Sequence, residues 1–164
     1  MSEQQQVTEH HPTKELFIED HKVTLNGVDL FFRTVGEGPV IFLIPPGWGV
    51  ASDYFQRSFL SLAENYRLVF VDTRGSGRSG RPADSSRMGT LDMAEDIEAV
   101  RVHMGLGKIS LLGHSNSGAI ALAYAERYSR SGGEACVGVE PGAGVEWRGG
   151  YTEDYPKASQ RFAL

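Results

Sequence analysis

The stretch ISLLGHSNSG, residues 109–118, decides the fold that this chain can adopt. Residues 109–112 are a short apolar run, which is typical of a strand buried on both faces of a parallel sheet. Gly113, Ser117 and Gly118 surround Ser115 with small residues, and residues 119–128 have the composition of a helix. A chain that turns sharply from a strand into a helix needs small residues at the bend. We therefore predict a strand, a tight turn that carries Ser115, and a helix.

Upstream of this stretch, apolar runs alternate with helical patterns. The runs at 40–44 and 67–71 predict two more buried strands. Helices are expected over residues 52–65 and from Thr90 onward. Strands that alternate with helices indicate parallel βαβ units with helices on both faces of the sheet. The second helix has a single apolar stripe, formed by Met93, Ile97, Val100 and Met104.

Residues 22–34 predict a β-hairpin on the N-terminal side of this sheet. Asn26 and Gly27 suit the two positive φ angles of a two-residue turn, and apolar residues alternate on either side of them. The expected fold class is therefore α/β, with a mostly parallel sheet, an N-terminal β-hairpin and helices on both faces.

The two ends of the sequence differ in composition from this predicted core. Residues 1–14 are polar, so we expect a flexible leader. Beyond Tyr128 the chain is rich in glycine and poor in large aliphatic residues, and only residues 135–139 resemble a strand. Such a segment buries too little apolar surface to offset its ordering entropy. The expected organisation is a leader (1–14), an α/β core (15–130) and a poorly structured tail (131–164).

The overall composition narrows the range of partners. A chain of 164 residues with a net charge of -5 fits one acidic domain, and it has no cluster of Lys and Arg for nucleic acid. No apolar run approaches the roughly 18–20 residues of a membrane-spanning helix, so no membrane partner is expected. The single cysteine, Cys136, and a polar N-terminus indicate the cytoplasm. No metal-ligand spacing is present, and the sequence carries no signal for an oligomeric state.

The motif at residues 113–118 resembles the G-x-S-x-G pattern of a nucleophile elbow, with one departure, and it has the right context, after a strand and before a helix. Ser115 is then the candidate nucleophile, at a helix N-terminus whose backbone N–H groups favour a developing negative charge. The small residues Gly113, Ser117 and Gly118 would support the bend, with Ser117 at a position that is usually glycine. The alternative is a structural turn that contains a serine.

Several motifs around this elbow resemble those of one superfamily. They are DTRGSGRS at 72–79, RPAD at 81–84 and MAEDIEAVR at 93–101. Together with the elbow they make residues 22–130 similar to the α/β-hydrolase superfamily, and to its proline-iminopeptidase-like branch. The resemblance implies hydrolysis of an ester or amide through an acyl-Ser115 intermediate, with a small-molecule or peptide substrate and no metal or organic cofactor. Haloalkane dehalogenases and epoxide hydrolases share this fold, but they carry aspartate where this chain has Ser115.

The oxyanion loop of that branch departs from its usual pattern in this chain. The sequence PPGWG at residues 45–49 stands where His-Gly-Gly-Pro-Gly is normal. By alignment, the resemblance implies that Gly47 and Asn116 supply the two oxyanion N–H groups. An ordinary Pro/Gly turn is the alternative for this stretch.

The glycine-rich loop at 74–82 also has two interpretations. The resemblance implies that Asp72 and Arg74 make structural hydrogen bonds that shape this loop. A phosphate cradle is the alternative, but no lysine follows in the position that a phosphate-binding loop requires.

The resemblance further implies a triad in the order serine, carboxylate, histidine. Carboxylates do follow Ser115, but all five histidines precede it. These histidines are His10, His11, His21, His103 and His114. Three hypotheses stay open: a truncated or misassembled hydrolase with an incomplete fold and weak or no activity, a non-catalytic binding domain, or an enzyme completed by a histidine from another chain. The glycine-rich tail favours the first.

Overall fold

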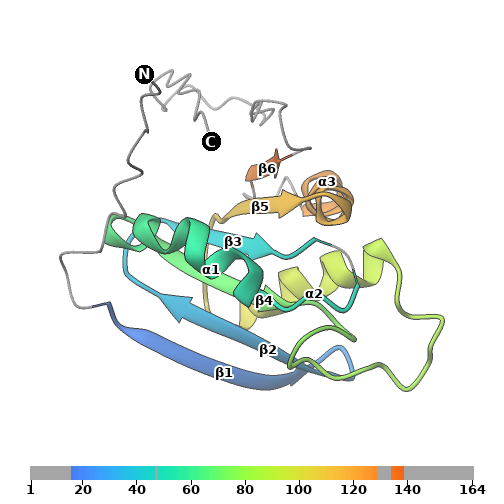
Figure 1. Cartoon of the computed structure of the whole chain (residues 1–164). Coiled ribbons are helices and arrows are strands. Elements are labelled where there is room, and N and C mark those ends of the chain that lie inside the picture. Colours follow the sequence, from blue (N-terminus) through green and yellow to red (C-terminus); the bar gives the residue numbers. More distant parts are fainter. Residues whose placement is uncertain (1–15, 47, 129–133, 139–164) are drawn as a thin grey trace, which may run out of the picture.

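Six strands form one sheet in the part of the chain that the computed structural model describes, residues 16–46, 48–128 and 134–138 (Figure 1). The strand order is β1-β2-β4-β3-β5-β6. The predicted leader, residues 1–14, and most of the predicted tail lie outside the described residues. The strands are β1 (Ile18–Leu25), β2 (Val28–Val35), β3 (Val40–Ile44), β4 (Arg67–Asp72), β5 (Ser110–His114) and β6 (Glu134–Gly138).

The predicted hairpin is confirmed as β1 and β2, which pair in antiparallel register from Ile18 opposite Val35 to Leu25 opposite Val28. Asn26 has a φ of 50° and the following glycine a φ of 74°, as a type I′ turn requires. The hairpin is longer than predicted because β1 begins at Ile18. The first residues of β1 are exposed at the sheet edge, so they show no alternation of apolar and polar residues.

The other strands form the predicted parallel part of the sheet. β2 is antiparallel to β4, whereas β3 is parallel to both β4 and β5, and β5 is parallel to β6. Parallel strands end at the same edge of a sheet. Ile44, Asp72 and His114, which end β3, β4 and β5, therefore lie along one edge. The loops that follow these three strands form the candidate functional site.

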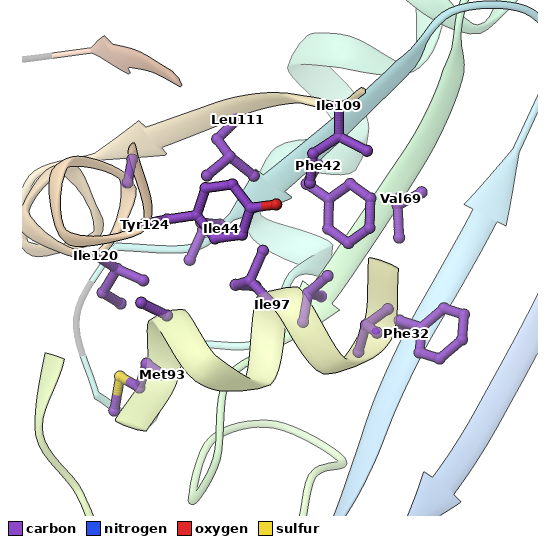
Figure 2. Packing of buried hydrophobic residues seen from close by; sticks show 14 of the residues in the cluster. Phe32, Phe42, Ile44, Val69, Met93, Ile97, Ile109, Leu111, Ile120 and Tyr124 are labelled. Atoms are coloured by element: carbon purple, nitrogen blue, oxygen red, sulfur yellow. The ribbon is translucent and has the colours of Figure 1, made fainter. Parts of the chain in front are cut away.

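Helices cover both faces of the sheet, as predicted. The helices α2 (Thr90–His103) and α3 (Asn116–Tyr128) pack on the face that carries Phe42, Ile44 and Leu111. Figure 2 shows these three side chains directed toward Ile97 and Tyr124 of the two helices. The opposite face is covered by α1 (Asp53–Phe59) and the 3₁₀ helix η1 (Leu60–Glu64), whose Phe55 and Ala63 pack against Leu43 and Phe70.

Two predicted helices differ from the observed ones. The helix expected over 52–65 is α-helical only to Phe59 and then tightens into η1. The helix expected from residue 119 begins at Asn116, directly after the bend. The prediction started too late because Asn, Ser and Gly are weak helix formers, and here their position in the bend overrides that preference.

A buried ion pair joins the loop after β4 to α2. The guanidinium of Arg74 is 1 % exposed and donates two hydrogen bonds of 2.6 Å to the carboxylate of Asp96. Its third nitrogen donates to the carbonyl of Arg87 at 2.7 Å. The side-chain amide of Asn26 in the hairpin turn also donates to Asp96, at 3.0 Å. Arg74 and Asp96 thus connect three separate segments at this end of the sheet.

Candidate functional site

Ser115 occupies the bend between β5 and α3, as the pattern predicted. Its φ of 58° is left-handed, and within the described ranges only Asn26 shares a positive φ among non-glycine residues. Such a conformation costs about 1–3 kcal/mol in a residue with a side chain, and it is found at nucleophile elbows. The residue is exposed, and the N–H of Gly118 donates to its carbonyl at 2.9 Å. The bend therefore presents the Ser115 side chain to the surface at the sheet edge.

Gly113 allows the strand and the helix to approach this closely. A Cβ atom on Gly113 would lie 2.5 Å from the carbonyl oxygen of Ser117 and 3.0 Å from the nitrogen of Gly118. Both atoms belong to the backbone of α3, so no side-chain movement could relieve the contact. The glycine is therefore required by the geometry of the bend.

Ser117 stands where the pattern usually has glycine, and its buried hydroxyl is used inside the bend. The oxygen accepts the N–H of His114 at 2.7 Å. It also lies 2.7 Å from the carbonyl of Ile44 and 2.9 Å from the carbonyl of His114. This side chain connects the end of β3 to the end of β5, next to the candidate nucleophile.

His114, the residue before the candidate nucleophile, is directed toward the first turn of α1. Its ring is nearly parallel to that of Tyr54, with centroids 6.0 Å apart. Its Nδ1 atom is buried and has no hydrogen-bond partner among the described residues. Within the described residues no hydrogen bond joins this imidazole to Ser115, so the structure does not pair the two as base and nucleophile.

The loop after β4 folds around the carboxylate of Asp72, which is fully buried. One carboxylate oxygen accepts the N–H of Ser52 at 2.7 Å. The other accepts the backbone N–H of Arg78 at 2.8 Å and its Nε at 2.9 Å. Burial raises the pKa of Asp72, but the hydrogen bonds from Arg78 and Ser52 outweigh it and hold the pKa below its usual value. Asp72 thus ties this loop to the start of α1.

The same loop leaves no room for a phosphate beside Gly77. A Cβ atom on Gly77 would lie 2.3 Å from a carboxylate oxygen of Asp72, so the carboxylate fills the space that the glycine leaves. A phosphate placed there would meet a buried negative charge. The arrangement favours the structural interpretation of the loop over the phosphate cradle.

The replacement Asp72→Asn is expected to reduce the acid sensitivity of the fold. Because the folded-state pKa of Asp72 is depressed, its carboxylate stabilises the fold above the unfolded pKa, near 3.8. That contribution is lost as the pH falls through the lower folded pKa. Urea unfolding followed from about pH 6 to pH 2 should therefore show a steeper loss below about pH 4 in wild type than in the variant. The exposed Glu126→Gln is the control, and identical pH profiles for wild type and Asp72→Asn would contradict the assignment.

The loop after β3 carries the predicted oxyanion segment. Gly47, one of the two predicted donors, lies outside the described residues. The neighbouring Trp48 is 56 % exposed, and its indole N–H donates to the carbonyl of Met88 at 3.3 Å. The N–H of Gly49 donates to the hydroxyl of Ser76 at 2.8 Å. The other predicted donor, Asn116, is the first residue of α3 and directly follows Ser115.

Four residues around this edge were missed in the sequence analysis. Ser52 and Arg78 bind the buried Asp72, Ser76 binds the loop after β3, and Tyr54 stacks on His114. Arg78 also lies over the ring of Phe31, 3.8 Å from its centroid. A serine or arginine in a glycine-rich loop is compatible with many roles, so the sequence held no specific signal for these contacts.

The part of the chain that the structure describes has neither a metal cluster nor a membrane span. It contains no group of three or more His, Cys, Asp or Glu residues that could hold a metal ion. Within the same residues no helix has the length and apolar character needed to cross a membrane.

Known proteins with similar sequences include several hydrolases. At the sequence level the chain is 36% identical over 108 residues to a bifunctional esterase/perhydrolase of Acinetobacter calcoaceticus, covering 64% of this chain and 38% of that protein. It is 34% identical over 131 residues to a proline iminopeptidase of Neisseria gonorrhoeae, covering 76% and 41%. The chain therefore spans about two fifths of the length of these relatives.

Solved structures show the same likeness. A proline iminopeptidase-related protein from Thermus thermophilus superimposes with a TM-score of 0.68 at 26% identity, over 74% of this chain and 44% of that one. An epoxide hydrolase gives the same TM-score and identity over 77% and 44%. The sequence model of the alpha/beta hydrolase fold matches residues 40–164, which is well over half of the chain. Together with the strand order and the strained bend at Ser115, this match shows that the chain belongs to the α/β-hydrolase family, within which it is similar to proline iminopeptidases.

Proposed function

We propose that this chain carries the nucleophile of a serine hydrolase that acts on an ester or amide bond. The observation that supports this most is the left-handed φ of Ser115 on an exposed bend between β5 and α3. That geometry frees the hydroxyl of a serine to attack a carbonyl carbon. A serine nucleophile forms an acyl-enzyme with an ester or amide, whereas the aspartate nucleophile of an epoxide hydrolase forms an ester with the opened epoxide. The serine at position 115 therefore favours the first reaction.

In the proposed reaction the Ser115 oxygen attacks the substrate carbonyl and forms a tetrahedral intermediate. The N–H of Asn116, at the start of α3, and that of Gly47 are proposed to donate to the oxyanion. Collapse of the intermediate breaks the bond to the alcohol or amine, which leaves with the proton that the Ser115 hydroxyl gave up, and an acyl-Ser115 ester remains; water then hydrolyses this ester to the carboxylic acid and free Ser115. Relatives named as an esterase/perhydrolase and as proline iminopeptidases support a small-molecule or peptide substrate. The single cysteine of the sequence supports a cytoplasmic location.

All five histidines in these 164 residues precede Ser115, so none of them can act as its base in the serine, carboxylate, histidine order. His114 is the nearest in sequence, and its ring stacks on Tyr54 instead of bonding Ser115. Catalytic serines without their histidine retain only a residual rate, which comes from the oxyanion site and substrate binding. We therefore propose that these residues carry the nucleophile of the hydrolase, and that Ser115, with no base hydrogen-bonded to it among the described residues, acylates slowly.

A fluorophosphonate probe tests the proposal, because its electrophilic phosphorus forms a covalent bond with a nucleophilic serine hydroxyl and needs no turnover. We expect slow labelling of the folded chain at one site, mapped by peptide mass spectrometry to Ser115 and absent in Ser115→Ala. The exposed Ser86→Ala should be labelled like wild type. A folded wild-type chain that takes up no probe over many hours would sink the proposal and favour a non-catalytic binding domain instead.

A further inference from the structure

The segment from Trp48 to Val50 has few contacts that could hold it in place among the described residues, whereas Ser52 beyond it is buried and bound to Asp72. Gly49 has a φ of 84°, and a Cβ atom built on it would meet nothing within 4 Å. Packing therefore does not fix this part of the loop. Its position depends on the hydrogen bond from the Gly49 N–H to the Ser76 hydroxyl, 2.8 Å long, and on the indole of Trp48 bound to Met88.

Ser76 is a rigid acceptor for that bond. It is 2 % exposed, and its own N–H donates to the carbonyl of Thr73 at 2.9 Å. The hydroxyl oxygens of Thr73 and Ser76 lie 3.2 Å apart. The loop that carries Ser76 is closed by the buried Asp72, so the acceptor has little freedom to move.

The two loops joined by this bond follow β3 and β4, and Ser115 follows β5. These three strands are adjacent and parallel, so the Ser76 hydroxyl and the nucleophile lie along the same sheet edge. We propose that Ser76 is a positioning residue that holds the loop after β3 in register with Ser115, so that a backbone N–H of this loop can face the acyl group. This inference rests on the proposed function. Ser76 itself does not touch the substrate.

The variant Ser76→Ala has a matched control in Ser79→Ala. Ser79 belongs to the same loop, and its hydroxyl accepts the N–H of Phe31 at 2.8 Å and donates to the carbonyl of Asp72 at 2.7 Å. Each variant removes one hydroxyl that bonds backbone groups, but of these two serines Ser76 is the one that accepts the N–H of Gly49. Comparable thermal midpoints of the two variants would show that they destabilise the fold equally, so a difference in labelling would not come from stability.

Two measurements decide the proposal. The first is the exchange rate of the Gly49 amide hydrogen, read by nuclear magnetic resonance on the full chain. The second is the rate of fluorophosphonate labelling at Ser115. In Ser76→Ala we expect Gly49 to exchange about tenfold faster and labelling to slow about tenfold, because misplacing a positioning element by about 1 Å costs up to about a hundredfold. Ser79→Ala should leave both rates near wild type, and Ser76→Thr, which keeps the hydroxyl, should restore both.

The outcomes separate this inference from the proposed function. Wild-type rates for both measurements in Ser76→Ala would overturn the positioning role while leaving Ser115 as the nucleophile. If wild type itself is not labelled, the proposed function fails, and the Gly49 exchange rate alone decides. In that case, faster exchange of the Gly49 amide in Ser76→Ala than in Ser79→Ala supports the role of Ser76 in holding the loop after β3, and equal exchange overturns that role.

Discussion

Replacing Asp96 by alanine is expected to lower the free energy of unfolding by about 3–5 kcal/mol, the largest loss from any single change considered. The variant would leave the guanidinium of Arg74 charged, 1 % exposed and without the carboxylate that accepts two of its hydrogen bonds, while the nearest oxygen of Asp92 lies 3.9 Å away. It would also remove the acceptor of the Asn26 side chain. Urea unfolding at neutral pH, with the m value compared to wild type, measures the loss.

An exposed pair of the same chemistry provides the control. Arg33 donates two hydrogen bonds to the carboxylate of Asp20, but the two side chains are 23% and 47% exposed. Asp20→Ala should therefore cost only about 0–1 kcal/mol. Equal losses in Asp20→Ala and Asp96→Ala would show that burial of the Arg74 pair does not matter. The double variant Arg74→Met with Asp96→Leu should recover much of the loss, because it removes both buried charges together.

The second large effect is expected at Gly113. Gly113→Ala would place a methyl group 2.5 Å from the carbonyl oxygen of Ser117, within the backbone of α3. The helix must then move away from β5, at a cost of about 3 kcal/mol in unfolding free energy. The displaced bend should also lose its fluorophosphonate labelling at Ser115. Stability is measured by urea unfolding and the labelling by mass spectrometry.

Gly107→Ala is the matched change for this experiment. A Cβ atom on Gly107 would meet nothing within 4 Å, and its φ is not in the left-handed region. This variant should keep wild-type labelling and gain up to about 1 kcal/mol from the smaller entropy of the unfolded chain. If Gly113→Ala proves as stable and as reactive as Gly107→Ala, the close approach of β5 and α3 at the bend is wrong.

The elements that the sequence predicted best are those with a strong local pattern. The apolar run before Ser115, the small residues around it and the helix after it are adjacent in the chain, so the bend could be predicted without tertiary information. The hairpin turn at Asn26 has the same advantage. The order of the strands could not be predicted in this way, because the placement of β4 between β2 and β3 depends on how the crossovers pack.

The contacts of the candidate site likewise divide into those set by local sequence and those set by tertiary packing. Ser115 and Asn116 follow from one local motif. The bonds of Ser76 to Gly49 and of Asp72 to Ser52 join residues 27 and 20 positions apart, and these loops meet only after the sheet has assembled. The base was not identified at either level, because no histidine follows Ser115 in the sequence and His114 is stacked on Tyr54.

The bond between Asn26 and Asp96 has a consequence for strand slippage. β1 lies at the sheet edge and is mostly exposed, and cross-strand pairs such as Asp20 with Arg33 contribute to its alignment with β2. A shift of one residue would carry the Asn26 amide away from α2 and leave the Asp96 carboxylate with one donor fewer. The hydrogen bond to a carboxylate 70 positions further along the chain therefore stabilises the observed alignment of the outermost hairpin. Out-of-register pairing of β1 and β2 would thus lose a hydrogen bond to the buried carboxylate of Asp96.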